Sequence, residues 1–191
     1  TSISNTHDYD ECHMPWTMAI GLLRIHINNK LDKRGYTPRE RSHKLSLAAN
    51  HFDQEVADIL NELIDESPYR TLRSGMKGIP IILQRNPTLD RLSAQLLYVT
   101  KIKSDNLEDN TIGLSVLVLK GPNADFDGDA LNMLLITDRK LYEQFYNMST
   151  HLGIQDLHNP RSVSGIVNIP APTCSTLGAF FSEHENLLAE A

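Results

Sequence analysis

Three carboxylates stand within five residues in the segment 123–129, which reads Asn-Ala-Asp-Phe-Asp-Gly-Asp. Two carboxylates about 4 Å apart repel each other by about 1 kcal/mol in water, and by several times more where water is scarce. A cation between them removes this cost, and an all-oxygen ligand set suits Mg²⁺, Mn²⁺ or Ca²⁺ rather than zinc. Gly128 lets the backbone turn tightly, so Asp125, Asp127 and Asp129 can converge on one point. The segment is therefore a candidate metal site.

Three interpretations of this acidic segment compete. A solvated turn is the ordinary reason for an acidic triplet, but Phe126 interleaves the acids and aliphatic runs flank them, which indicates a partly enclosed loop. An EF-hand loop needs a glycine after the third acid and a Glu eleven positions after the first. Those places hold Ala130 and Ile136, so this interpretation fails. A catalytic magnesium site for phosphoryl or nucleotidyl transfer is the third interpretation.

The residues of 123–129 resemble the signature of the largest subunit of multisubunit DNA-dependent RNA polymerases, the bacterial β′ type. Residues 84–92, Gln-Arg-Asn-Pro-Thr-Leu-Asp-Arg-Leu, resemble that family's Asn-Arg-Ala-Pro-Thr-Leu-His-Arg-Leu motif. Residues 12–15, Cys-His-Met-Pro, resemble its Cys-Gly-Leu-Pro element, and residues 147–150, Asn-Met-Ser-Thr, resemble its Met-Met-Ser-Thr segment. The motifs fall in the family's order, and the resemblance runs from about residue 12 to residue 181.

The resemblance implies a role for each candidate site residue. Asp125, Asp127 and Asp129 would hold one catalytic Mg²⁺, and a second Mg²⁺ would arrive with the nucleoside triphosphate. The RNA 3′-hydroxyl would attack the α-phosphate in line, and pyrophosphate would leave. Arg85 and Asn123 correspond to the residues that read the ribose hydroxyls, which suits their fixed donor geometry. Without the resemblance, Arg85 would more often be a surface arginine and Asn123 a turn residue.

The resemblance also implies a fold and partners. We expect the α+β class, with a helical lead-in followed by part of a double-psi β-barrel. The enzyme would be a DNA-directed RNA polymerase, active only with a β-like subunit and the remaining pieces of the β′-like subunit. Template DNA, nascent RNA and nucleoside triphosphates are the other partners. Because the family's first barrel strands would precede residue 1, and its bridge helix and trigger loop would follow residue 191, we expect a fragment or one piece of a divided subunit.

The sequence departs from the family pattern around an intact acidic triplet. Gln84, Asn86 and Asp90 replace Asn, Ala and His, and Ala-Leu-Asn at 130–132 replaces Gln-Met-Ala. This drift indicates a distant branch, such as the split-subunit polymerases of giant bacteriophages, found in the cytoplasm of a bacterial host or in the virion. Two alternatives stay open: a non-catalytic metal-binding scaffold barrel, and a double-barrel polymerase with an RNA template.

The elements that must position these residues differ between the two parts of the chain. After an irregular stretch over 1–15, apolar spacing predicts a mainly helical part to residue 70. Its helices would run from about residue 16 to 33 and from Thr37-Pro38 to Ser67-Pro68. The part from 71 to 191 would form the barrel portion. Its expected elements are strands at 79–83, 96–102, 112–120, 131–136 and 165–169, and helices at 138–145 and 173–181.

Composition narrows the class of protein. Of the 191 residues, 40% are hydrophobic and 22% are charged, which is too apolar for a disordered chain. No apolar run approaches the roughly 20 residues of a membrane span, and no secretory signal is evident. We therefore expect a cytoplasmic protein with no membrane partner. Cys12 and Cys174 are too few for a disulfide framework, and the metal-binding side chains at 7–13 lack a second ligand pair at a zinc spacing.

The net charge of −6 hides an asymmetry. Residues 1–23 carry −3, residues 24–91 carry +3 and residues 92–191 carry −6. A solvated surface is the more common use of such a basic part, but its local excess could hold a polyanion. Low overall basicity is compatible with an assembly whose other subunits hold the nucleic acid. The five cations concerned, opposed by Asp90, are Arg70, Arg73, Lys77, Arg85 and Arg91.

Overall fold

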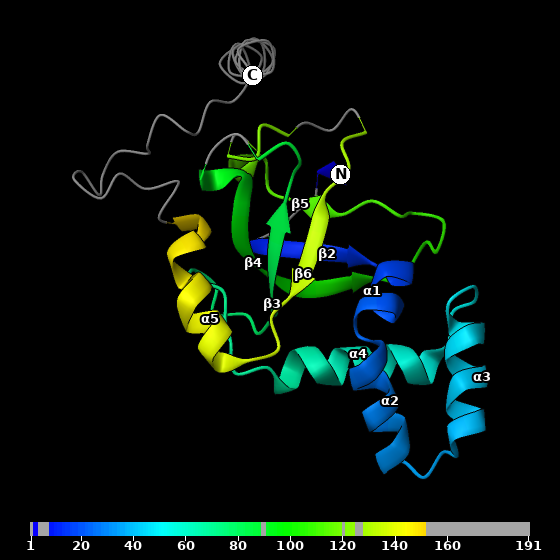
Figure 1. Ribbon diagram of the computed structural model, residues 1–191. Coiled ribbons are helices and arrows are strands. Elements are labelled where there is room, and N and C mark those ends of the chain that lie inside the picture. The colour runs from blue at the N-terminus through cyan, green and yellow to red at the C-terminus, as the bar shows by residue number, and fades with distance from the viewer. Residues whose placement is uncertain (1, 4–7, 89–90, 120, 125–127, 152–191) are drawn as a thin grey trace, which may run out of the picture.

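The computed structural model describes residues 2–3, 8–88, 91–119, 121–124 and 128–151. They form an α+β arrangement in which four helices gather at one end of a mixed sheet and a fifth lies beside it (Figure 1). The helices are α1 (Trp16–Leu22), α2 (Arg24–Lys33), α3 (Pro38–Ala48), α4 (Gln54–Glu66) and α5 (Arg139–Phe145). The strands are β1 (Ser2–Ile3), β2 (Glu11–Pro15), β3 (Ile79–Gln84), β4 (Ala94–Lys103), β5 (Gly113–Leu114) and β6 (Asn132–Leu135). Three 3₁₀ turns are η1 (Arg91–Ser93), η2 (Val116–Val118) and η3 (Tyr146–Met148).

The strands form one sheet in the order β1-β5-β2-β4-β3-β6. Strand β4 runs parallel to β2 and antiparallel to β3, which in turn runs antiparallel to β6. The prediction that residues 1–15 are irregular is wrong for β2, which lies inside the sheet. Its Cys12 and Met14 are buried, but partners more than 80 residues away decide its pairing, so local composition gave no signal. The sheet supports the α+β class, while the double-psi barrel stays a prediction.

Each of the two long predicted helices is divided in the structure. Leu23, at φ −95° and ψ 11°, separates α1 from α2. The predicted start at Thr37 is confirmed by a capping box with Glu40. The segment beyond it divides because Asp53 caps a new helix, its carboxylate accepting a hydrogen bond from the Val56 N–H at 3.0 Å. No helix in the described ranges is both long and apolar enough to cross a membrane.

Three of the predicted strands are confirmed as β3, β4 and β6. The predicted strand at 112–120 is largely wrong, because only β5 is extended and η2 follows it. Ser115 explains the change, since its hydroxyl accepts a hydrogen bond from the Leu117 N–H at 3.4 Å and favours a turn over a ladder. The predicted helix after Asp138 is confirmed as α5. The elements expected at 165–169 and 173–181 lie outside the described residues.

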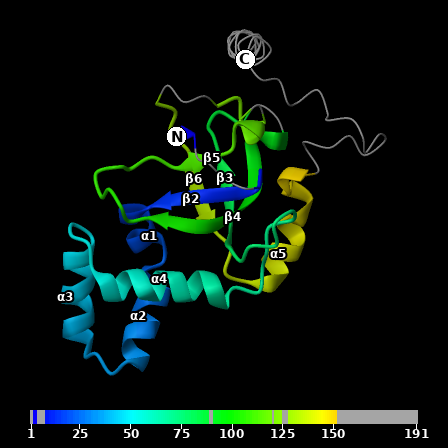
Figure 2. The ribbon, with the colours of Figure 1, turned by 180° about the vertical axis from the view of Figure 1, so that it is seen from behind.

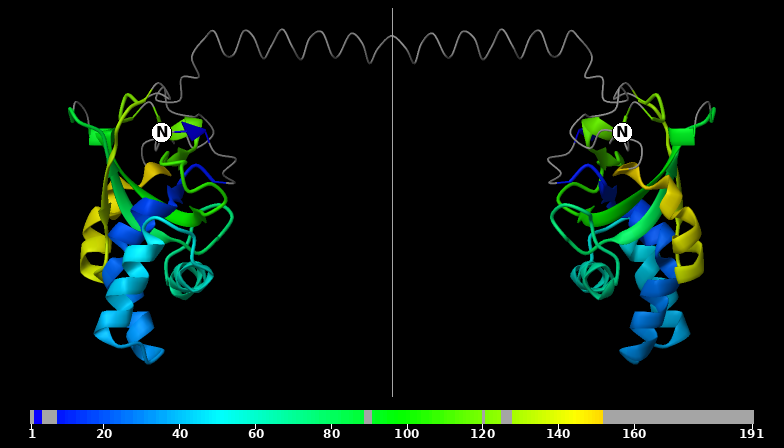
Figure 3. Two further views of the ribbon diagram at one scale, coloured as in Figure 1. Left: turned by 90° about the vertical axis from the view of Figure 1, so that its right-hand side faces the viewer. Right: turned by 90° about the vertical axis from the view of Figure 1, so that its left-hand side faces the viewer.

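The sheet buries a different cluster on each face. The larger cluster joins α1, α2 and α4 to Ile81, Leu83, Leu97 and Val99 of β3 and β4. The smaller cluster lies under α5 and consists of Ile82, Leu96 and Ile136 with partly buried side chains around them. Figures 2 and 3 show α4 and α5 on opposite sides of the strands. Strand alternation therefore assigns neighbouring residues of β3 to opposite faces.

Two buried aspartates of the N-terminal segment hold the loop that leads into β3. The Asp8 carboxylate accepts a hydrogen bond from the Ser74 N–H at 2.6 Å, and that of Asp10 accepts one from the Leu72 N–H at 3.1 Å. Burial raises the pKa of Asp10 to about 6.

Burial also raises the pKa of Cys12 to about 12, which opposes a thiolate ligand at neutral pH. Within the described ranges, no group of three or more His, Cys, Asp or Glu side chains could hold a metal ion.

The core assignment predicts different costs for two isoleucine truncations. Ile59 of α4 is fully buried, whereas Ile25 of α2 is 73% exposed. We expect Ile59→Ala to lower the free energy of unfolding by about 2 to 5 kcal/mol, because it removes buried methyl groups and leaves a cavity. The control Ile25→Ala makes the same chemical change in a helix and should cost less than about 0.5 kcal/mol. Urea denaturation of the full chain measures both, and equal costs would contradict this core.

The buried Asp10 predicts a pH dependence of stability. Its carboxyl titrates near pH 6 in the folded chain and near 3.8 in the unfolded chain. Between these values the folded chain holds a proton that the unfolded chain has released, so the free energy of unfolding falls as pH rises from about 4 to about 6. Asp10→Asn keeps an acceptor for the Leu72 N–H but does not titrate. The free energy of unfolding of Asp10→Asn, relative to that of the wild type, should therefore rise by about 1 to 3 kcal/mol between pH 4 and pH 6 in denaturation experiments. Parallel pH profiles of the two proteins would refute the assignment.

Candidate functional site

Two predicted site residues from distant segments meet at one end of the sheet. Strands β3 and β6 align Gln84 with Asn132, so Arg85 and Asp129 leave and approach the sheet at the same end. Arg85 Nη2 lies 2.9 Å from Asp129 Oδ1 and donates a hydrogen bond to it. The two side chains are only 22% and 17% exposed, so the ion pair is partly shielded from water.

The turn that carries Arg85 is held by hydrogen bonds on both sides. The Arg85 N–H donates to the carbonyl of Ser93 at 3.1 Å, which ties the end of β3 to η1. Gln84 Nε2 donates to Thr88 Oγ1 at 2.7 Å, across the turn. Gln84 is one of the departures from the family pattern, and its longer side chain makes this bond. The backbone of Arg85 is therefore fixed independently of its ion pair.

Asn123 stands immediately before the acidic segment in an unusual conformation. Its φ of +51° lies in the left-handed region, where asparagine is tolerated better than most side chains. The Ala124 N–H donates to the Leu119 carbonyl at 2.9 Å and closes the turn. The Asn123 side chain is exposed. Asn123 is therefore a turn residue in the structure, and its role in reading the ribose stays a prediction.

Only part of the acidic triplet lies in the described ranges. Asp125 and Asp127 fall outside them, so the convergence of the three carboxylates stays a prediction. Gly128 has φ +118°, a conformation that L side chains rarely adopt, as expected for the tight turn. A Cβ there would have nothing within 4 Å, so conformation rather than space requires the glycine. Asp129 follows it directly and faces Arg85.

Two basic residues of the middle part, Arg70 and Lys77, lie apart from Arg85. Arg70 Nη1 donates to the Gly75 carbonyl at 2.8 Å, and Lys77 Nζ donates to the Asp65 carbonyl. Both precede β3, whereas Arg85 follows it, and an extended strand of six residues separates its ends by about 17 Å. Arg70 and Lys77 therefore lie apart from Arg85, and whether the basic excess holds a polyanion or is the more common solvated surface stays open.

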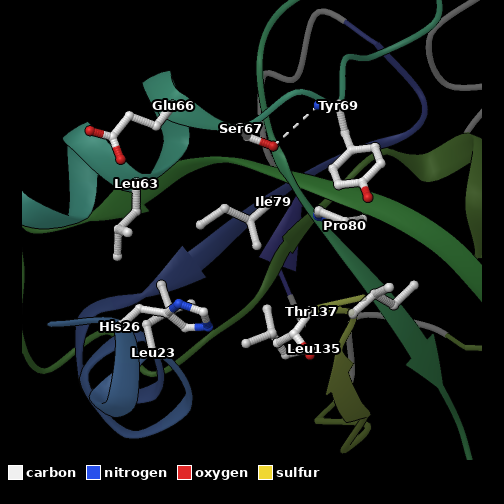
Figure 4. A pocket seen from close by; sticks show the side chains of 11 residues that line it. Leu23, His26, Leu63, Glu66, Ser67, Tyr69, Ile79, Pro80, Leu135 and Thr137 are labelled. Atoms are coloured by element: carbon white, nitrogen blue, oxygen red, sulfur yellow. Dashed lines mark hydrogen bonds between the residues drawn. The ribbon is translucent and has the colours of Figure 1, made fainter. Parts of the chain in front are cut away.

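An apolar cavity in the described part of the chain is separate from this site. It has a volume of about 170 Å³ and lies between α2, α4, β3 and β6 (Figure 4). Leu23, Leu63, Ile79 and Leu135 make it mainly apolar. Its Pro80 lies toward the end of β3 away from Arg85, so the cavity adds no group to the ion pair.

Sequence reasoning missed one buried polar residue beside the site. Gln95 lies in the otherwise apolar start of β4, is 5% exposed, and hydrogen-bonds the carbonyls of Leu92 and Val118. A glutamine within a run of aliphatic residues could have indicated a hydrogen-bonding role, because a polar group that is buried requires partners.

Comparison with known proteins places all these residues in a known family. The family described as RNA polymerase Rpb1, domain 2, matches residues 22–147, which include the whole candidate site. The DNA-directed RNA polymerase subunit beta′ of Aliarcobacter butzleri (strain RM4018) is 35% identical over 122 residues, which are 64% of this chain and 7% of that relative. The chain thus spans a small part of the length of that relative. Because the family match covers well over half of its residues, this chain belongs to the RNA polymerase Rpb1 domain 2 family, a part of the β′-type subunit of RNA polymerase.

Proposed function

We propose that this chain carries the metal-binding loop of a multisubunit DNA-directed RNA polymerase and takes part in nucleotidyl transfer to the RNA 3′ end. The observation that carries the proposal is the 2.9 Å pair of Arg85 and Asp129. It joins two segments, 44 residues apart in sequence, that each resemble a motif of the polymerase family. A catalytic site that uses residues of both motifs requires them to lie together in this way.

Asp125, Asp127 and Asp129 are the residues that would hold Mg²⁺. The donor set fits a hard cation, since it offers carboxylate oxygens alone. The half-buried Asp129 beside the positive-φ Gly128 supports this assignment. When bound, Mg²⁺ supplies Lewis-acid activation of the RNA 3′-hydroxyl and neutralises charge developing at the phosphate. A second Mg²⁺ would arrive with the nucleoside triphosphate.

Arg85 and Asn123 would bind the ribose of the incoming nucleotide. A guanidinium has five N–H donors in a rigid plane, so a bond to Asp129 leaves others for ribose hydroxyls. The backbone at Asn123 is held by a closed turn, and the exposed Asn123 amide can donate from it. Both residues would act by orientation, which lowers the entropic cost of bringing the α-phosphate to the nucleophile.

The remaining partners follow from the proposed enzyme. A β-like subunit, the rest of the β′-like subunit, template DNA and nascent RNA would complete the site, and the described sheet would form part of a double-psi β-barrel. The departures at Gln84 and at 130–132 support a distant branch such as the split-subunit bacteriophage polymerases. In that case the polymerase would work in the cytoplasm of the bacterial host or be carried in the virion.

The catalytic role is tested by Asp127→Ala in the assembled polymerase. We expect RNA synthesis on DNA to fall roughly a thousandfold, because metal stabilisation of developing charge supplies several kcal/mol and each 1.4 kcal/mol is tenfold in rate. Asp105→Ala, in an exposed loop, is the matched control and should leave the rate unchanged. Undiminished synthesis by Asp127→Ala would support the scaffold alternative. Synthesis by the unmodified assembly on an RNA template but not on a DNA template would support the RNA-templated alternative.

The role of Arg85 is tested by Arg85→Lys in the same assembly. Lysine keeps a cation beside Asp129 but lacks the planar fork. We expect kcat/KM for ribonucleoside triphosphates to fall about tenfold or more, with a smaller loss for 2′-deoxy analogues, because the lost bonds are those to ribose hydroxyls. Arg139→Lys, whose arginine is 84% exposed and pairs with Glu143, is the control and should change neither value. Equal losses for the two sugars would exclude ribose recognition by Arg85.

A further inference from the structure

We propose that Gln95 and Gly121 form a positioning device, which sets the segment of Asn123 against the turn of Arg85 and thereby determines discrimination for ribose. The inference rests on the proposed function, because it assigns these two residues to the same nucleotide site. Neither residue would touch the nucleotide. Both would act through the backbone segments that carry Arg85 and Asn123.

Gln95 joins the two segments by hydrogen bonds from a single amide group. Its Nε2 donates to the Leu92 carbonyl at 2.9 Å and to the Val118 carbonyl at 3.1 Å. Leu92 belongs to η1, which follows the Arg85 turn, and Val118 ends η2, which precedes Asn123. One side chain therefore spans from the Arg85 side of the site to the Asn123 side.

Gly121 provides the space that this contact needs. A Cβ on Gly121 would lie 2.2 Å from Gln95 Nε2, 2.8 Å from Leu92 Cβ and 2.8 Å from the Leu92 carbonyl oxygen. Real Cβ atoms essentially never approach so closely, and the Leu92 carbonyl belongs to the backbone, so it cannot turn aside as a flexible side chain would. The chain at 121 thus packs directly on the bridge made by Gln95.

Each side of the bridge continues to a site residue through a short path. On one side, η1 also contains Ser93, whose carbonyl accepts the Arg85 N–H at 3.1 Å. On the other side, Gly121 stands two residues before Asn123, whose turn is closed by the bond from Ala124 to Leu119. Arg85, Gln95 and Pro122 also line one small cavity with apolar side chains around it. The contact network is therefore continuous from Arg85 to the Asn123 turn.

The glutamine at position 95 is better explained by a positioning role than by a contribution to the stability of the fold. Its neighbours Leu96 and Leu97 are fully buried and apolar, and Gln95 Oε1 is a buried oxygen without a hydrogen-bond partner in the described part of the chain. A buried unpartnered acceptor is unfavourable, and an aliphatic side chain would avoid it. What the amide adds is a directional link between two backbone carbonyls that an aliphatic side chain cannot make.

The test uses Gln95→Met in the assembled polymerase, because methionine keeps the length of the side chain and removes both donated bonds. The measured quantity is the ratio of kcat/KM for a ribonucleoside triphosphate to that for its 2′-deoxy analogue on one primed DNA template. We expect this ratio to fall about fivefold or more. Gln144→Met, at an exposed glutamine of α5, is the matched control and should keep the wild-type ratio.

Gly121→Ala tests the same contact from the other side. Its methyl group would push on Leu92 and Gln95, so the ratio should again fall, whereas Gly21→Ala, with nothing within 4 Å of the added carbon, should not change it. A purely structural role would reduce the amount of active enzyme for both sugars equally, so an unchanged ratio in the active fraction of either variant would overturn the proposal. Full activity of Asp127→Ala would instead overturn the proposed function, which keeps the two failures distinct.

Discussion

The antiparallel pairing of β3 with both β4 and β6 is the constraint on which the rest of the structure depends. Gln84 pairs with Ala94 on one side and with Asn132 on the other. The Arg85 turn, which leads into the start of β4, therefore lies beside the approach to β6, a segment distant in sequence. A shift of one residue would reverse the faces of β3 and exchange its two clusters. Burial on both faces thus fixes the register, and the register fixes where Arg85 can reach.

Burial at the opposite end of β3 supports this register. The loop before β3 is held by the carboxylates of Asp8 and Asp10, which belong to the segment that leads into β2. Burying a carboxylate is costly unless it accepts hydrogen bonds, and both make such bonds to backbone N–H groups. Hydrogen bonds from Ser74 and Thr71 and the charge of Arg73 outweigh the effect of burial and lower the pKa of Asp8. The N-terminal segment therefore belongs to the same folded body as the site.

Electrostatics at the site end include the ion pair between Arg85 and Asp129, the last acid of the segment 123–129. Arg85 offsets part of the repulsion that three carboxylates within five residues must create. It does so from a backbone that the Ser93 carbonyl holds in place, so the ion pair need not position the arginine by itself. Gln95 supplies the corresponding link to the segment before the acids. The positive charge thus comes from Arg85, whereas Ser93 and Gln95 hold the backbone segments in place. Substitutions can therefore change the charge and the backbone position separately.

The sequence by itself determined the α+β class, the starts of α3 and α5, and the strands β3, β4 and β6. These depend on residue type and on local periods, which a chain displays without its fold. Tertiary structure alone decided that the polar residues 11–15 become an inner strand, and that the run at 112–120 is mostly turn. It also separated Arg70 and Lys77 from Arg85, and gave Gln95 its hydrogen-bond partners. At 112–120 a short-range bond from the Leu117 N–H to the Ser115 hydroxyl accompanies the turn. For the inner strand and for the bond of Gln95 to Val118, the partners lie far along the chain, and no local pattern encodes a contact whose energy arises only when distant segments meet.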